Sequence, residues 1–136
     1  MNWDELLNKG IVRKTFPDKL LADSLIQESA KKLRTIRKIA IDSDSAGMII
    51  VELYEALREI CEAIAINKGF KIYTHEAITC FIKEILGEDL ISAKFDRYRK
   101  IRNGADYYGE SPEIGETQKA SLEIPRLIND LEKYLR

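Results

Sequence analysis

Apolar residues recur at helical spacing along most of this chain, and no run alternates apolar and polar residues for long enough to predict a strand. Glycines and polar turns separate the periodic segments, which predicts long helices with short connections. Pro125 falls inside the last helix and removes one backbone hydrogen bond, so a kink or break is expected near Ser121. The expected helices cover residues 18–39, 46–68, 75–86 and 89–108, with a fifth after Ser111 and Pro112. The predicted fold class is therefore all-α, an antiparallel four-to-five-helix up-and-down bundle.

The segment 46–68 has the widest apolar surface in the chain. Its apolar residues, from Met48 to Ile66, spread over a broader arc than one face of a bundle helix needs. We therefore expect a central helix that is contacted on more than one side. We also expect a homodimer whose interface uses this helix and the helix at 89–108. Several glutamates interrupt the segment, so it is not a membrane span and no membrane contact is expected.

The whole chain, residues 1–136, is predicted to be a single helical domain. Residues 1–18 form an N-terminal arm ahead of the bundle at 19–136. Within the arm, Trp3 to Asn8 predict a short helix that ends at Gly10. Docking of this arm onto the bundle is expected, and a loose tail is the alternative. The side chains expected to dock it are Trp3, Leu6 and Leu7.

Composition narrows the function classes only a little. The chain is 45% hydrophobic and 33% charged, and its formal net charge of −1 attracts no polyanion as a whole. Any nucleic-acid contact must therefore come from a local basic patch. Cys61 and Cys80 form no CxxC pair, which predicts reduced thiols, and the acidic N-terminus does not look like a signal peptide. These two features predict a cytoplasmic location. No cofactor and no metal are expected, because no phosphate loop or metal-binding motif is present.

The segment from Phe95 to Gly109 concentrates arginine and tyrosine and carries the main chemical signal. On a helix, Arg102 falls inside an apolar stripe, where a guanidinium keeps its charge and needs a carboxylate, a carbonyl or a bound anion. Asp106, one turn later, is a ready partner. Arginine beside aromatic rings is also typical of RNA recognition, through phosphate contacts and base stacking. The residues expected to bind nucleic acid are Arg97, Arg99, Arg102 and Tyr108.

Several short patterns, taken in order, resemble the HEPN domain (higher eukaryote and prokaryote nucleotide-binding). Arg102-Asn103-x-x-x-Tyr107 is similar to the R-N-x-x-x-H motif of that family, and Ala105-Asp106-Tyr107 to a triplet found in one prokaryotic branch. Upstream, the chain resembles a Y-x-A helix, a glycine stop and a Thr-His helix start. The residues that carry this upstream resemblance are Leu53 to Ala56, Gly69-Phe70 and Thr74-His75-Glu76.

The resemblance, which spans about residues 20–135, implies an antiparallel helical bundle that dimerises with its motif helices facing a shared cleft. It also implies RNA or a nucleotide as ligand, and a toxin–antitoxin-type pairing with a minimal nucleotidyltransferase. Carried over by position, the candidate catalytic residues are Arg102, Asn103 and Tyr107.

The sequence departs from the motif at Tyr107, which occupies the histidine position. A phenol with an ordinary pKa of about 10 is a poor general base near neutrality. Arg102 and Tyr107 are also about 140° apart on a straight helix, so convergence is expected only if the helix ends near Gly104 or a partner subunit contributes. The chain's one histidine, His75, is interpreted as structural, because no catalytic partner accompanies it.

Three interpretations follow from these patterns. The first is a HEPN-like RNA-associated dimer with weak or absent ribonuclease activity. The second is an active metal-independent endoribonuclease that uses Arg102 and Tyr107. The third is a structural helical module in which Arg102 only pairs with Asp106 or with a glutamate of the helix at 46–68.

Overall fold

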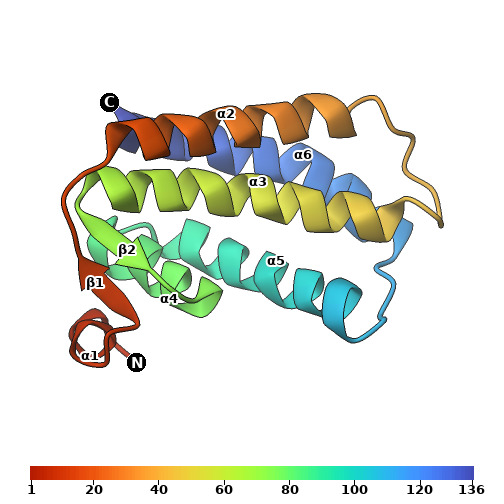
Figure 1. Ribbon diagram of the computed structural model, residues 1–136. Coiled ribbons are helices and arrows are strands. Elements are labelled where there is room, and N and C mark those ends of the chain that lie inside the picture. The colour runs from red at the N-terminus through yellow and green to blue at the C-terminus, as the bar shows by residue number, and fades with distance from the viewer.

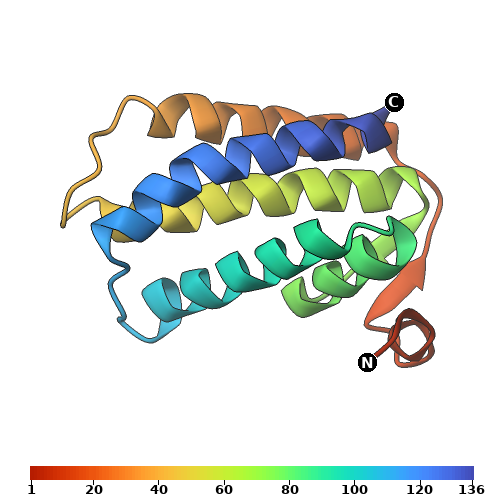
Figure 2. The same cartoon turned by 180° about the vertical axis from the view of Figure 1, so that it is seen from behind.

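The computed structural model describes all 136 residues and shows long helices packed side by side, which confirms the all-α bundle (Figures 1 and 2). The long helices α2, α3, α5 and α6 run along the molecule, and α1 and a two-stranded ribbon lie at one end. The helices are α1 (Trp3–Asn8), α2 (Lys19–Ile36), α3 (Ala46–Asn67), α4 (His75–Cys80), α5 (Asp89–Tyr107) and α6 (Ile114–Leu131). The remaining elements are β1 (Val12–Lys14), β2 (Phe70–Ile72), a π-helical turn η1 (Phe81–Ile85) and a 3₁₀ turn η2 (Glu132–Leu135).

Helix α3 is the central helix, as predicted. It packs against α2, α5 and α6, and among its large apolar side chains only Met48 is exposed. The wide apolar arc is therefore used inside one chain, because three neighbouring helices cover it. The width of this arc therefore gives no support to a dimer through α3, and the aromatic residues of the helix at 89–108, the other reason for expecting a homodimer, are left to support it. No helix of the molecule is both long enough and apolar enough to cross a membrane.

The N-terminal arm is docked, with Trp3 and Leu6 buried and Leu7 packed against the core. The indole of Trp3 meets the rings of Phe70 and Phe81, with centroids 5.2 and 5.7 Å away. This contact brings α1 onto the segment that follows α3. The alternative of a loose tail is therefore wrong.

The arm also contributes a strand that the sequence pattern did not predict. β1 pairs antiparallel with β2, so that Val12 lies opposite Ile72 and Arg13 lies opposite Lys71. Each strand has only three residues, which is too short for alternation to stand out from chance. Gly69 immediately precedes β2, and its φ of +83° suits glycine.

Two helix expectations need correction. The predicted helix at 75–86 is α4 continued by the π-helical turn η1, which ends before Gly87. A kink or a break was expected near Ser121; helix α6 runs unbroken through Pro125, so the break is wrong. The inner face of α6, including Ile124 and Leu127, is buried against α3. The free energy gained by this apolar burial outweighs the loss of one backbone hydrogen bond at Pro125.

Candidate functional site

Arg102 lies near the C-terminal end of α5 and reaches across to α3. Its Nη2 atom is 3.2 Å from Glu55 Oε1 and 3.5 Å from Asp106 Oδ2, and only 12% of the side chain is exposed. The expected pairing with Asp106 is confirmed, and the glutamate of the central helix is a second partner. A guanidinium does not lose its charge, so one this buried needs carboxylate partners of this kind.

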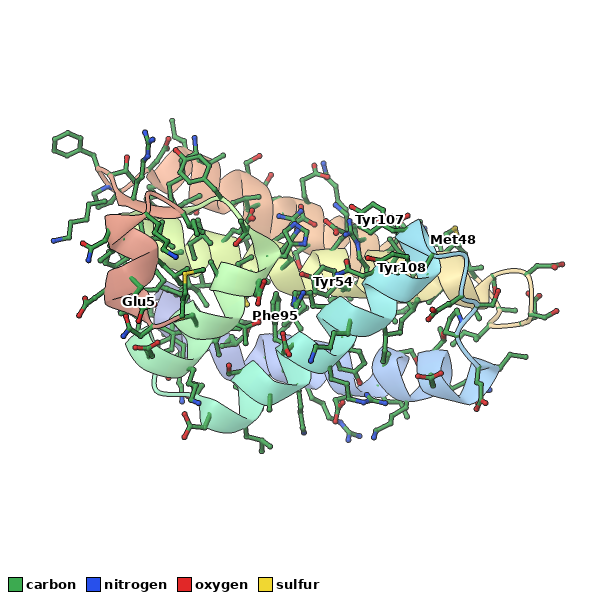
Figure 3. The ribbon with its side chains drawn as sticks, turned by 90° about the horizontal axis from the view of Figure 1, so that it is seen from below. Glu5, Met48, Tyr54, Phe95, Tyr107 and Tyr108 are labelled. Carbon is green, nitrogen blue, oxygen red and sulfur yellow. The ribbon has the colours of Figure 1, made fainter.

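Two tyrosine rings hold the Arg102 guanidinium between α3 and α5. Its carbon Cζ is 5.7 Å from the centroid of the Tyr54 ring and 5.0 Å from that of Tyr107, both within cation–π range. Its Nη1 atom also donates to the Tyr107 hydroxyl at 3.1 Å. Figure 3 shows Tyr54 midway along the molecule and Tyr107 near the end of α5.

The three candidate catalytic residues meet within one chain. Nη1 of Arg102 is 3.4 Å from Asn103 Oδ1, in addition to its bond to Tyr107. The expectation that this needs a helix end near Gly104 or a partner subunit is wrong, because α5 continues to Tyr107. The two residues meet on a continuous helix because the arginine and tyrosine side chains are long enough to reach each other around it.

Glu55 connects Arg102 to a second arginine on α3. Arg58 donates to Glu55, with Nη2 and Oε2 2.6 Å apart, and its Nη1 lies 2.7 Å from Glu62. Burial opposes the charge on Arg58, but Glu62 and Glu55 outweigh it and raise its pKa. Three carboxylates therefore accompany two guanidiniums, and the cluster has no excess positive charge. Within it, the Nε atom of Arg102 is buried without a hydrogen-bond partner.

His75 belongs to this neighbourhood, which sequence reasoning missed. Its Nδ1 atom is 3.0 Å from the Tyr54 hydroxyl, and Tyr54 is the ring that lies against Arg102. Burial is the main cause that lowers the pKa of His75, with a further contribution from Arg58. The imidazole is therefore neutral near pH 7. Its position after the Thr74 cap was visible in the sequence, but the contact depends on how α4 packs against α3.

The expected nucleic-acid residues of α5 do not form one surface with Arg102. Arg99 donates to Asp96 at 2.8 Å, and its side chain is 16% exposed. Arg97 is exposed and lies over the ring of Tyr98, with Cζ 5.4 Å from the centroid. Tyr108 is 74% exposed beyond the cluster. Arg97 and Arg99 point to different sides of the helix because two residues turn it by about 200°.

A pocket of about 670 Å³ opens beside Arg99 rather than at the Arg102 cluster. It lies between α1, α4 and α5, and Asp96 on its wall pairs with both Arg99 and Lys100. Arg99 and Lys100 are thus already paired, whereas Lys83 on the same wall takes part in no ion pair. No group of three or more His, Cys, Asp and Glu side chains is arranged to hold a metal ion.

Comparison with known proteins adds no assignment to this geometry. No protein-family model, no curated protein and no solved structure matches the chain.

Proposed function

We propose that this chain is a HEPN-like helical protein of an RNA-associated, toxin–antitoxin-type system, with weak or absent ribonuclease activity of its own. The partner proposed by the resemblance is a minimal nucleotidyltransferase. The helical bundle and the order of the sequence patterns support this proposal. The observation that carries it is the contact of Arg102 with Tyr107 inside one chain.

The side chains around Arg102 explain why ribonuclease activity should be weak. Arg102 already faces two carboxylates, so an RNA phosphate must compete with Glu55 and Asp106 for the guanidinium. Asp106 is the partner more easily displaced, because it is the more distant and its side chain is 42% exposed. Tyr107 also stands where the motif has histidine, and a neutralised arginine stabilises little extra charge in a transition state.

An active metal-independent endoribonuclease is a second candidate, and the position of His75 favours it. A neutral imidazole exchanges protons near pH 7, and this one is linked through the Tyr54 hydroxyl to the ring beneath Arg102. In this candidate His75 takes over the proton transfer that the motif assigns to the position of Tyr107.

Cleavage of a mixed RNA pool in the presence of EDTA separates the two candidates. The natural protein is compared with Tyr107→His, Arg102→Ala and His75→Gln. Arg126→Ala is the control because Arg126 is an exposed arginine of α6 that takes part in no ion pair and is not among the cluster residues. We expect little cleavage by the natural protein and a gain of about tenfold or more in Tyr107→His, within the range of general acid–base catalysis.

Strong cleavage by the natural protein that is lost in Arg102→Ala but kept in Arg126→Ala contradicts weak activity and favours the nuclease. A parallel loss in His75→Gln then assigns proton transfer to His75. Circular dichroism of each variant shows whether a loss of cleavage follows from a loss of fold.

A homodimer remains part of the proposal, now on a different observation. Met48, Tyr107 and Tyr108 are exposed by 49%, 65% and 74%, and they lie at the same end of the molecule (Figure 3). This end is formed by the start of α3 and the end of α5 (Figure 1). Exposed aromatic and methionine side chains are enriched at protein interfaces. A dimer through this end would bring two Arg102 clusters towards each other.

A further inference from the structure

The outer face of the β1–β2 ribbon places two cations directly opposite each other. Arg13 and Lys71 are partners in the antiparallel register, and like charges at such positions repel. The ring of Tyr73, two residues after Lys71, lies near both cations. Its ring centroid is 5.6 Å from Arg13 Cζ and 5.3 Å from Lys71 Nζ.

The cations of the ribbon are not neutralised, in contrast to Arg99 and Arg102. None of them has a carboxylate within 4.0 Å. Asp18, the acidic residue that follows β1, is used as the cap of α2, where it accepts from the Leu21 backbone N–H at 3.0 Å. The exposed, unpaired cations of the ribbon and its flanks are Lys9, Arg13, Lys14, Lys68 and Lys71.

One aromatic ring is exposed beside the facing cations, that of Tyr73, which is 51% exposed. The opposite face of the ribbon is held in place, because Val12 is buried and Phe70 packs against Trp3. Tyr73, Arg13 and Lys71 therefore sit on a fixed support, which keeps the entropy cost of binding low.

We propose that this ribbon face, defined as Arg13, Lys71 and Tyr73, binds single-stranded nucleic acid. Unpaired cations attract phosphates, and exposed rings offer surfaces on which unpaired bases stack. A paired duplex would leave the ring unused, because its bases are stacked on one another. An acidic peptide would use the cations and gain little from the ring.

The ribbon face is separate from the Arg102 cluster. The ribbon lies at one end of the molecule and the end of α5 at the other (Figure 1). Binding at the ribbon therefore requires neither Arg102 nor a dimer through Tyr107 and Tyr108, and it stands even if the proposed function fails.

Fluorescence anisotropy with a labelled oligouridine of about 12 nucleotides tests this site, a length within the range that a single binding surface covers. Arg13→Gln with Lys71→Gln removes the facing cations. The matched control is Arg34→Gln with Arg37→Gln, which removes two exposed cations of the α2 region that take part in no ion pair. Tyr73→Leu removes the stacking ring, and Tyr73→Phe keeps it.

We expect the ribbon double variant to weaken binding about tenfold or more at low salt, and Tyr73→Leu about fivefold or more. The control pair and Tyr73→Phe should stay within about twofold. Equal losses in both double variants, an unchanged affinity in Tyr73→Leu, or the absence of binding by the natural protein would overturn the proposal. Competition by polyglutamate as strong as by unlabelled oligouridine would also overturn it, in favour of an acidic peptide.

Discussion

At the scale of single residues, the charge of Arg102 is the feature that most needs an explanation. Removing a guanidinium from water costs several kcal/mol, and one imperfect ion pair does not repay this. Here Glu55, Asp106 and the rings of Tyr54 and Tyr107 together offset the desolvation cost. Since all four partners come from the same chain, Arg102 is held in place before any ligand arrives.

This arrangement predicts an asymmetric double-mutant cycle. Glu55→Gln leaves Arg58 and Arg102 beside a neutral amide, whereas Arg102→Gln leaves Glu55 still paired with Arg58. We expect Glu55→Gln to lower the free energy of unfolding by about 2–3 kcal/mol and Arg102→Gln to lower it by less. The coupling energy between the two positions should be about 1–2 kcal/mol. Urea unfolding of the natural protein, both single variants and the double variant gives these values. Additive effects would show that the pair contributes nothing.

At the scale of elements, the long helices were predictable and the ribbon was not. Periodicity over about 20 residues identifies a helix such as α3 because many positions agree. A three-residue strand has too few positions, and the partner of β1 lies more than fifty residues away, after α3. The same limit hid the contact of His75 with Tyr54, while the pairing of Arg102 with Asp106, one turn apart, was visible from spacing alone.

Gly69 connects α3 to β2, and a substitution there tests the packing of the whole arm. Its φ is +83°, and a Cβ atom would lie 2.9 Å from the Thr15 carbonyl oxygen. Gly69→Ala is therefore expected to destabilise by about 2 kcal/mol or more, through both backbone strain and the clash. The fluorescence of Trp3, the only tryptophan, should shift to the red as α1 loosens from Phe70.

Two glycines provide matched controls for this variant. Gly87→Ala shares the positive φ but meets no atom within 4 Å, and Gly115→Ala has neither strain nor contact. The expected order of destabilisation is Gly69 first, Gly87 second and Gly115 last. If Gly69→Ala costs no more than Gly87→Ala, the close approach of the arm to Gly69 contributes nothing to stability.

At the scale of the whole molecule, the two ends of the bundle have different surface chemistry. The ribbon end presents unpaired cations beside an exposed ring, whereas the α5 end presents Met48, Tyr107 and Tyr108 next to a neutralised arginine cluster. Apolar and aromatic exposure at the α5 end suits a protein partner better than a polyanion. This difference is the basis for proposing self-association at the α5 end and a separate nucleic-acid surface at the ribbon end.

Sedimentation velocity at tens of micromolar tests the first half of that division. We expect a species of twice the 15.6 kDa mass of one chain. Met48→Glu with Tyr108→Glu should shift it to the monomer, because two glutamates per subunit would place like charges within an apolar contact. Leu90→Glu is the control, since Leu90 is a 68% exposed apolar residue at the other end of α5.

A natural protein that sediments only as a 15.6 kDa monomer would remove the homodimer from the proposed function. A dimer that survives the double variant but dissociates in Leu90→Glu would place the interface at the start of α5 instead. The first outcome leaves binding at the ribbon unaffected, because that surface is complete within one chain. Anisotropy measured on Met48→Glu with Tyr108→Glu should likewise show an unchanged affinity for oligouridine.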